Sequence, residues 1–283
     1  MYSGFISSRK TVAAIGVHQR FDMAAYRVAS PYFADGTFPT LRQILHFEGI
    51  NGPDGLKVKS PGKHEPSHLY NPVTDVGPIP DHIKGHYTQL VAALKNGDNV
   101  RAAFEASWMA HYICDGLTPA HHFPLEDKIA EHSSKEPNPG SSFFKHKVVG
   151  KGDTPADAVR RGWAIWGGKG LLTTHFNFEM GVATALLAQK IKVQLDPVKL
   201  AHARQVGAIT FFKEESRDIA KLEMYDKFYN HGWNGELARL VKNRLAPQTA
   251  QTIAIIWLLA YLEAGLDAAK IDAVTPGKAK AKK

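Results

Sequence analysis

The stretch His111-Tyr-Ile-Cys-Asp-Gly-Leu-Thr-Pro-Ala-His-His122 decides how this chain of 283 residues folds. It continues a strongly helical run, and positions four apart on a helix point the same way, so His111 and Asp115 share one face. The Gly and Pro that follow end the helix and turn the chain. The turn brings His121 or His122 back toward that face. Imidazole and carboxylate groups gathered in this way are ligands that suit Zn²⁺.

A histidine followed four residues later by an acid is by itself a weak signal, because solvated helix faces carry such pairs too. The sequence contains several of them: His18/Asp22, His111/Asp115, His122/Glu126, His132/Glu136 and His175/Glu179. We favour His175/Glu179 as a second ligand pair because it lies in a strongly helical run. The pair His132/Glu136 lies in a Ser- and Pro-rich loop, where a spacing of four has no helical meaning. The pair His122/Glu126 would have to use the same turn of the chain as His121.

The stretch around Asp115 resembles the His-x-x-x-Asp-x-x-x-x-x-His core of the bacterial zinc-dependent phospholipases C, whose fold the fungal zinc nucleases for single strands share. Other segments resemble the family in the same order: Gly16-Val-His18, Glu48-Gly-Ile-Asn-Gly-Pro-Asp54, Ser67-His68-Leu-Tyr-Asn-Pro72, His175-Phe-Asn-Phe-Glu179 and Arg244–Tyr261. The resemblance covers about residues 16–265 of the sequence. It implies an all-α, single multi-helix domain around a polynuclear zinc site.

The resemblance also implies the ligands of two or three zinc ions. They are histidines and acids, grouped by ion as Asp54, His68, His111 and Asp115; then His121, His175 and Glu179; then His18 with Asp115 as a bridge. Glu48 is the alternative carboxylate to Asp54, which itself stands in a turn-like Gly-Pro-Asp-Gly. Asp54 is also the expected catalytic residue, which orients or deprotonates the attacking water.

The third zinc site departs from the family pattern. In the family, an N-terminal Trp helps to hold this ion, whereas here no Trp precedes Trp108 and 17 residues precede His18. The site is therefore absent, completed by Asp22 or water, or formed only after N-terminal trimming.

Composition is that of a globular protein, with 44% hydrophobic and 22% charged residues. We expect an irregular segment at 1–15, one helical domain at 16–268 and a basic disordered tail at 269–283. Helices are predicted near 20–29, 40–45, 81–94, 99–115, 126–131, 171–192, 197–225 and 247–264, with long loops at 49–70 and 132–153.

The single cysteine, Cys114, excludes an internal disulfide and is expected to be a buried packing thiol.

Net charge is +8, and much of the excess lies in the C-terminal tail, which holds five of the lysines. Contact with nucleic acid or a membrane is one interpretation of this tail, and a solvated end is the other. No apolar run approaches the length of about 18 residues that a membrane span needs, and Ile253–Leu262 fits a buried helix. No clear signal peptide precedes residue 17, so the sequence leaves the compartment open.

These observations predict a zinc-dependent hydrolase whose substrate is a phosphodiester, either a phospholipid or a nucleotide, with peripheral membrane contact and no protein partner implied. A nuclease or nucleotidase on the same scaffold is the first alternative, and a non-catalytic helical metal-binding protein is the second. Trp163, Trp166 and Phe143 are candidates for stacking a base. Aromatic residues at such spacings are more common in a core.

Overall fold

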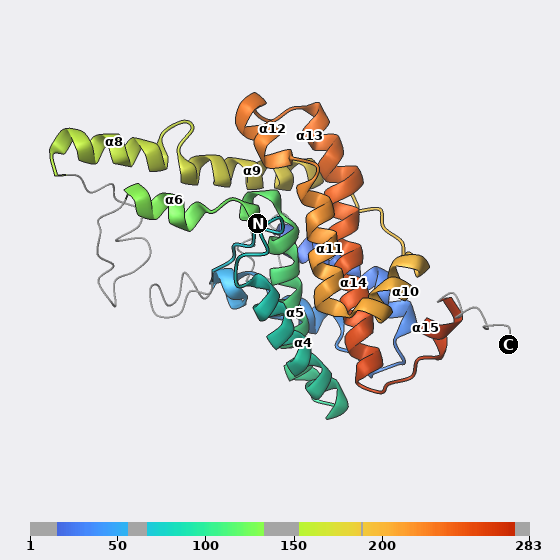
Figure 1. The fold of residues 1–283 in the computed structure, drawn as a ribbon. Helices are drawn as coiled ribbons and strands as arrows, with labels where there is room; N and C mark the ends of the chain where they lie inside the picture. The colour runs from blue at the N-terminus through green and yellow to red at the C-terminus, as the bar shows by residue number, and fades with distance from the viewer. Residues whose placement is uncertain (1–15, 56–66, 133–152, 188, 275–283) are drawn as a thin grey trace.

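Helix α5 (Asn99–Leu117) lies at the centre of the structure, a computed structural model that describes residues 16–55, 67–132, 153–187 and 189–274 (Figure 1). Asp98 starts this helix by accepting a hydrogen bond from the backbone N–H of Arg101 (2.9 Å). Most of the side chains that follow are small or apolar, and nearly all from Ala102 onward are buried. Helix α5 is thus the element against which other helices pack.

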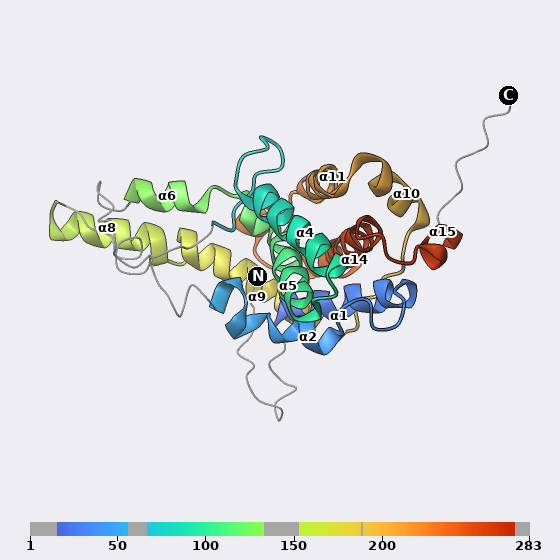
Figure 2. The ribbon, with the colours of Figure 1, turned by 90° about the horizontal axis from the view of Figure 1, so that it is seen from below.

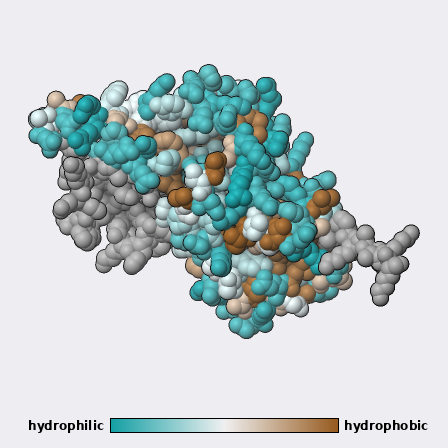
Figure 3. Space-filling view, in the orientation of Figure 1, coloured by the Kyte–Doolittle hydropathy of each residue, from teal (hydrophilic) through white to brown (hydrophobic). Residues whose placement is uncertain are grey.

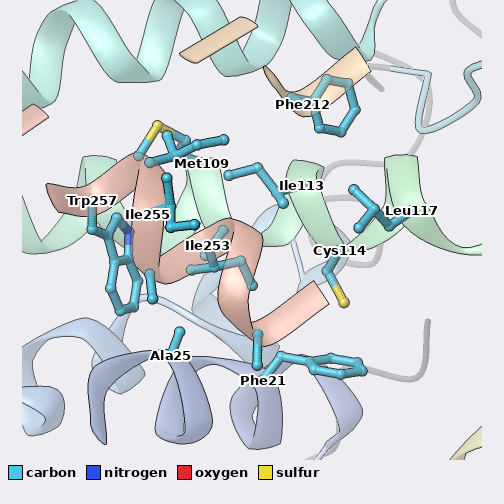
Figure 4. Packing of buried hydrophobic residues seen from close by; sticks show 14 of the residues in the cluster. Phe21, Ala25, Met109, Ile113, Cys114, Leu117, Phe212, Ile253, Ile255 and Trp257 are labelled. Carbon is cyan, nitrogen blue, oxygen red and sulfur yellow. The ribbon is translucent and has the colours of Figure 1, made fainter. Parts of the chain in front are cut away.

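The helices that contact α5 come from both ends of the chain (Figures 1 and 2). They are α1 (Val17–Ala29), α2 (Leu41–His46), α4 (Ile79–Lys95), α11 (Ala208–Ala220) and α14 (Ala246–Glu263). Figure 4 shows Ile113 and Cys114 of α5 packed among side chains of α14 and α1, including Ile253 and Phe21. Cys114 is buried, as the sequence predicts for a packing thiol.

The helix that crosses the core beside α5 is unusually long and apolar. It runs from α13 (Gly235–Leu240) through a π-helical segment (Val241–Leu245) into α14, where the indole N–H of Trp257 donates to the carbonyl of Ala106 (3.1 Å). By length and hydropathy (1.3) this stretch alone, among the described residues, qualifies as a membrane span, but 83% of its apolar window is buried inside the protein. Because a buried core helix passes the same test, this is weak support for a span.

Three helices form an arm that extends away from this core, as both ribbon views show (Figures 1 and 2). They are α6 (Leu125–His132), α8 (Pro155–Trp166) and α9 (Leu171–Leu186), and α9 leads back into the body of the molecule. A small separate core of Leu125, Ile129 and Ile165 holds α6 and α8 together. Helix α8 starts at Thr154, whose hydroxyl accepts from the N–H of Asp157 (3.2 Å).

The second half of the chain differs from the sequence prediction in three places. The single helix expected at 197–225 is divided into α10 (Pro197–Val206), α11 and α12 (Met224–His231). Gly207 adopts φ +85° and thereby separates α10 from α11. Helix α9 ends at Leu186 and does not reach residue 192. The predicted disordered tail is wrong for Ala269–Val274, which form α15 with Ile271 fully buried.

No strand occurs among the residues that the structure describes, which hold one isolated bridge between Asn71 and Val76. Short 3₁₀ segments complete the described elements at Ser30–Tyr32, Gly49–Asn51 and Pro119–His122. The all-α prediction is therefore confirmed. On the face shown in Figure 3, hydrophobic residues form separate patches in a mostly hydrophilic surface.

Candidate metal centre

The C-terminal turn of α5 builds the centre of the site. His111 and Asp115 lie one turn apart, and the Nε2 atom of His111 is 3.2 Å from Oδ2 of Asp115. Asp115 is fully buried. Gly116 follows because a Cβ there would lie 2.4 Å from the ring of Phe212, so only glycine lets α11 approach α5 this closely. The backbone carbonyl of Gly116 then accepts a hydrogen bond from Ser216 Oγ (2.6 Å).

The turn after α5 orients His121. Its Nδ1–H donates to the backbone carbonyl of His68 (2.6 Å), and the N–H of Tyr70 donates back to the carbonyl of His121 (3.0 Å). These two bonds join segments about 50 residues apart. With Nδ1 occupied in this way, Nε2 of His121 faces Glu179 Oε1 (3.0 Å) and Asp115 Oδ1 (3.5 Å).

Three groups of potential metal ligands come together here, each within the reach of one ion. Their members are His18, His111 and Asp115; Asp54, His68 and His111; and His121, His175 and Glu179. All eight ligands predicted from the sequence are included. The pairing of His175 with Glu179 follows from their positions on α9, where His175 Nε2 lies 3.0 Å from Glu179 Oε1.

Asp115 connects the three groups because its two carboxylate oxygens face different imidazoles. Oδ2 lies 2.8 Å from His68 Nδ1, while Oδ1 lies 3.4 Å from His18 Nε2. The ring of His18 stacks on that of His111 with centroids 3.9 Å apart and planes at 7°. His18, on the first turn of α1, is thereby part of the cluster although no Trp precedes it. A carboxylate in this position can bridge two ions.

Asp54 forms the more exposed side of the cluster. Its Oδ1 atom lies 3.7 Å from His68 Nδ1 and 3.8 Å from His111 Nε2, and 31% of its side chain is exposed. His175 and Glu179 are 14% and 13% exposed. Because the other predicted ligands are almost fully buried, solvent reaches the cluster along these three side chains.

Glu48 occupies a role that the sequence did not assign. It is buried, and its Oε1 accepts a hydrogen bond from Nδ1 of His111 (2.9 Å), while Ser107 Oγ donates to its Oε2 (3.4 Å). The sequence offered Glu48 as an alternative to Asp54, but it lies behind His111, on the nitrogen that points away from the cluster. No local signal marks this contact, because Glu48 and His111 are 63 residues apart.

Asp22, considered for completing the third group, is not a member of any of the groups found among the described residues. It is buried on α1, where burial and the neighbouring Glu48 raise its pKa well above the ordinary value. The shift favours protonation of Asp22, and its absence from the ligand groups is a separate, geometric finding.

Electrostatics of the cluster favour charged carboxylates. Burial opposes the charge on Asp115, but the imidazoles of His121, His111 and His18 outweigh it and hold the pKa of Asp115 well below its ordinary value. Burial also opposes the charge on His111, yet Glu48 and Asp115 raise its pKa to about 10. Burial and the stacked His111 together lower the pKa of His18. Asp115 thus stays ionised and attracts cations.

The competing histidine–acid pairs lie elsewhere. His122 Nε2–H donates to the carbonyl of Gly116 (3.0 Å) and points back at the end of α5, so the choice of His121 agrees with the geometry. His132 ends α6, and Glu136 lies outside the described residues.

Trp163 and Trp166 are exposed, which contradicts the expectation of core packing. Phe143 also lies outside the described residues.

The donor set fits zinc. Nε2 of His111 lies 3.4 Å from Nδ1 of His68, and the carboxylates of Asp54 and Asp115 face the same point. Two imidazole nitrogens and two carboxylates aimed at one another are satisfied together by one cation that accepts all of their lone pairs. Nitrogen and oxygen donors in this ratio are those of zinc sites.

Comparisons with known proteins bear on the fold. No protein-family model matches the chain, and no curated protein matches it. The crystal structure of alpha-toxin from Clostridium perfringens, isolated from avian strain SWCP, is similar with a TM-score of 0.54 and 13% identity over 88% of this chain. Alpha-toxin from Clostridium absonum is similar over 92% of the chain, with a TM-score of 0.46 and 10% identity. The chain spans 64% and 65% of the length of these toxins. The first likeness shows that this chain shares an all-helical fold with the C. perfringens toxin, as expected from the sequence.

Proposed function

We propose that this chain is a zinc-dependent hydrolase of phosphodiesters, of the phospholipase C type. One observation carries the proposal: the fully buried Asp115 belongs to one ligand group and lies 2.8 Å from His68 and 3.5 Å from His121, which belong to the other two. The three groups together contain all eight predicted ligands. The sequence resemblance to zinc-dependent phospholipases C supports it. The likeness in fold to alpha-toxin from C. perfringens also supports it.

Each group of side chains has a role in this proposal. A first ion would be held by Asp54, His68, His111 and Asp115. A second would be held by His121, His175 and Glu179, and a third by His18 and Asp115. When bound, zinc supplies Lewis acidity, which draws charge from phosphate oxygens and lowers the pKa of water to about 7. Asp115 would serve two ions, because its two carboxylate oxygens face different histidines from one buried helix.

Asp54 is the proposed catalytic residue. Its carboxylate is the most exposed of the ligand set, so water and a phosphodiester can reach it, and it can accept the proton of the attacking water. Nδ1–H of His121 donates to the carbonyl of His68 and Nδ1–H of His111 donates to Glu48, so each ring presents Nε2 to the cluster, where it would bind zinc in its deprotonated form. The exposed side also favours a catalytic over a purely structural site, since structural zinc sites are closed.

The test is metal analysis of the purified chain combined with assays on two diesters. We expect at least two zinc ions per chain and release of phosphorylcholine from short-chain phosphatidylcholine, with little release from a phosphomonoester. A dinucleotide is assayed in parallel, and its hydrolysis in place of the phospholipid would indicate a nuclease and not a phospholipase C. A zinc-loaded chain that hydrolyses none of these compounds would leave only the non-catalytic metal-binding function.

A further inference from the structure

The arm exposes large apolar side chains at helical spacing. On α8, Val159, Trp163 and Trp166 are 72%, 73% and 49% exposed, and they follow one another by four and three residues, so they form one stripe. On α9, Phe176 and Met180 are 55% and 37% exposed, again four residues apart. Isolated apolar residues are normal on a surface, but aligned groups of this size mark a binding surface. We call these five residues the arm face.

The backbone at the end of α8 passes close to the indole of Trp163. The N–H of Gly167 donates to the carbonyl of Trp163 (2.7 Å), and a Cβ on Gly167 would lie 2.5 Å from that carbonyl and 2.9 Å from the indole ring. Glycine therefore lets the chain close tightly under the ring at the end of α8.

Positive side chains accompany the arm face. Arg160, 80% exposed, and Arg161 both pair with the single carboxylate of Asp157 (2.6 and 2.8 Å), so one positive charge is left over. Lys169, in the turn between α8 and α9, lies 5.6 Å from the ring centre of Tyr229. Tryptophan beside arginine and lysine is the composition of helices that lie in a membrane interface, where phosphates attract the cations and the rings enter the headgroup layer.

The arm face is also continuous with the candidate metal centre. Phe176 and Met180 directly follow His175 and Glu179, so the apolar stripe of α9 lies about 100° around the helix from its ligand stripe. A surface that binds the arm face therefore lies next to the second ligand group. This neighbour relation favours a layer of substrate molecules over an unrelated protein partner.

We propose that the arm face docks on a phospholipid bilayer, so that the site draws its substrate from a membrane surface. The substrate class rests on the proposed function, whereas docking itself does not. Trp163 and Trp166 enter the headgroup layer, and Arg160 and Lys169 contact lipid phosphates. The second ligand group, on the same helix as Phe176 and Met180, then lies near that layer.

The test uses the full chain and vesicles of phosphatidylcholine with phosphatidylglycerol, followed by co-sedimentation and by tryptophan emission. Because Trp163 and Trp166 are the exposed tryptophans, docking is expected to shift the emission to shorter wavelength. The double variant Trp163→Ser/Trp166→Ser is expected to bind vesicles at least about tenfold more weakly. It should keep the wild-type rate on monomeric short-chain phosphatidylcholine. Val100→Ser/Val198→Ser, at exposed valines outside the arm, is the matched control and should bind like the wild type.

Absence of vesicle binding by the wild-type chain would overturn the proposal. An equal loss of activity on monomeric lipid in the double variant would also overturn it, because the arm face would then act on the site itself. So would a dimer in solution that the double variant abolishes, since the occupant would be a second copy. Vesicle binding that depends on the arm face, with no hydrolysis of any diester, would refute the proposed function and leave docking intact.

Discussion

Glu48→Gln removes one charge from behind the metal centre while keeping the shape of the side chain. In the native structure Oε1 of Glu48 accepts a hydrogen bond from Nδ1–H of His111 over 2.9 Å, and both side chains are almost fully buried. The carboxylate fixes the ring and keeps the proton on Nδ1, so Nε2 is the nitrogen that faces Asp54 and Asp115. A neutral amide accepts the same bond more weakly and is as able to donate to the ring as to accept from it.

The size of the effect follows from this one bond. A hydrogen bond to a charged group contributes about 1.5–3 kcal/mol, and a neutral one about 0.5–1.5 kcal/mol. The difference of about 1–2 kcal/mol corresponds to a loss of roughly 5- to 30-fold in zinc affinity at the first ligand group. This agrees with the loss of about 10–100-fold that follows removal of carboxylate partners of metal-bound histidines. Hydrolysis at limiting zinc should fall by the same factor and recover when zinc is added.

The assay is competition for zinc between the protein and a chromophoric chelator, with circular dichroism as a check on folding. Glu105→Gln is a matched control on α5, the helix that carries His111. Glu105 is as buried as Glu48, and its Oε2 accepts a hydrogen bond from Nδ1 of His86 over 2.6 Å, outside the ligand groups. We expect the control to lose stability but to keep its zinc affinity. Equal zinc affinity in Glu48→Gln and the wild type would refute the reasoning that the carboxylate acts through His111.

Three further outcomes are expected. Asp115→Asn should lose at least one metal ion and lower hydrolysis by orders of magnitude, with the helix still folded. The exposed Asp218→Asn should change neither metal content nor activity. Full metal content and near-normal activity in Asp115→Asn would exclude the proposed role of Asp115 as a bridge between two metal ions. Chelation should lower the melting temperature, because metal bound only by the folded state adds to its stability, and calorimetry that shows no shift would contradict this. His122, whose pKa burial lowers from 6.5 to about 4, takes up a proton first in the unfolded chain. The contribution of His122 to the stability of the metal-free protein is therefore complete above about pH 6.5 and is lost as the pH falls toward 4. In urea unfolding, the free energy of unfolding of His122→Gln should fall less steeply than that of the wild type as the pH is lowered over this range.

Local periodicity predicted much of the site. A helix places residues four apart on one face, which pairs His111 with Asp115 and His175 with Glu179. The choice of His175/Glu179 among the five such pairs also rested on the family resemblance. The Gly and Pro after Asp115 predicted the turn that returns His121. The order of motifs along the chain supplied the rest of the predicted ligand set through the family resemblance, and the structure brings these side chains together.

Other features depend on contacts that the sequence does not reveal. The exposed tryptophans at 163 and 166 have the spacing of core residues, and only the position of α8 in the arm exposes them. The break at Gly207 requires a positive φ that glycine permits but does not impose. Residues 269–274 look like the start of a basic tail, yet Ile271 finds a place in the core.

The sequence by itself determined which residues share a helix face, that the fold is all-helical, and where α5 ends. These are consequences of hydrogen bonding within one or two turns of the backbone. Tertiary structure alone decided that Glu48 lies behind His111, that His68 holds the tautomer of His121, and that His122 points away. Those contacts join segments up to 63 residues apart, or choose between adjacent side chains, and are determined by how the helices pack.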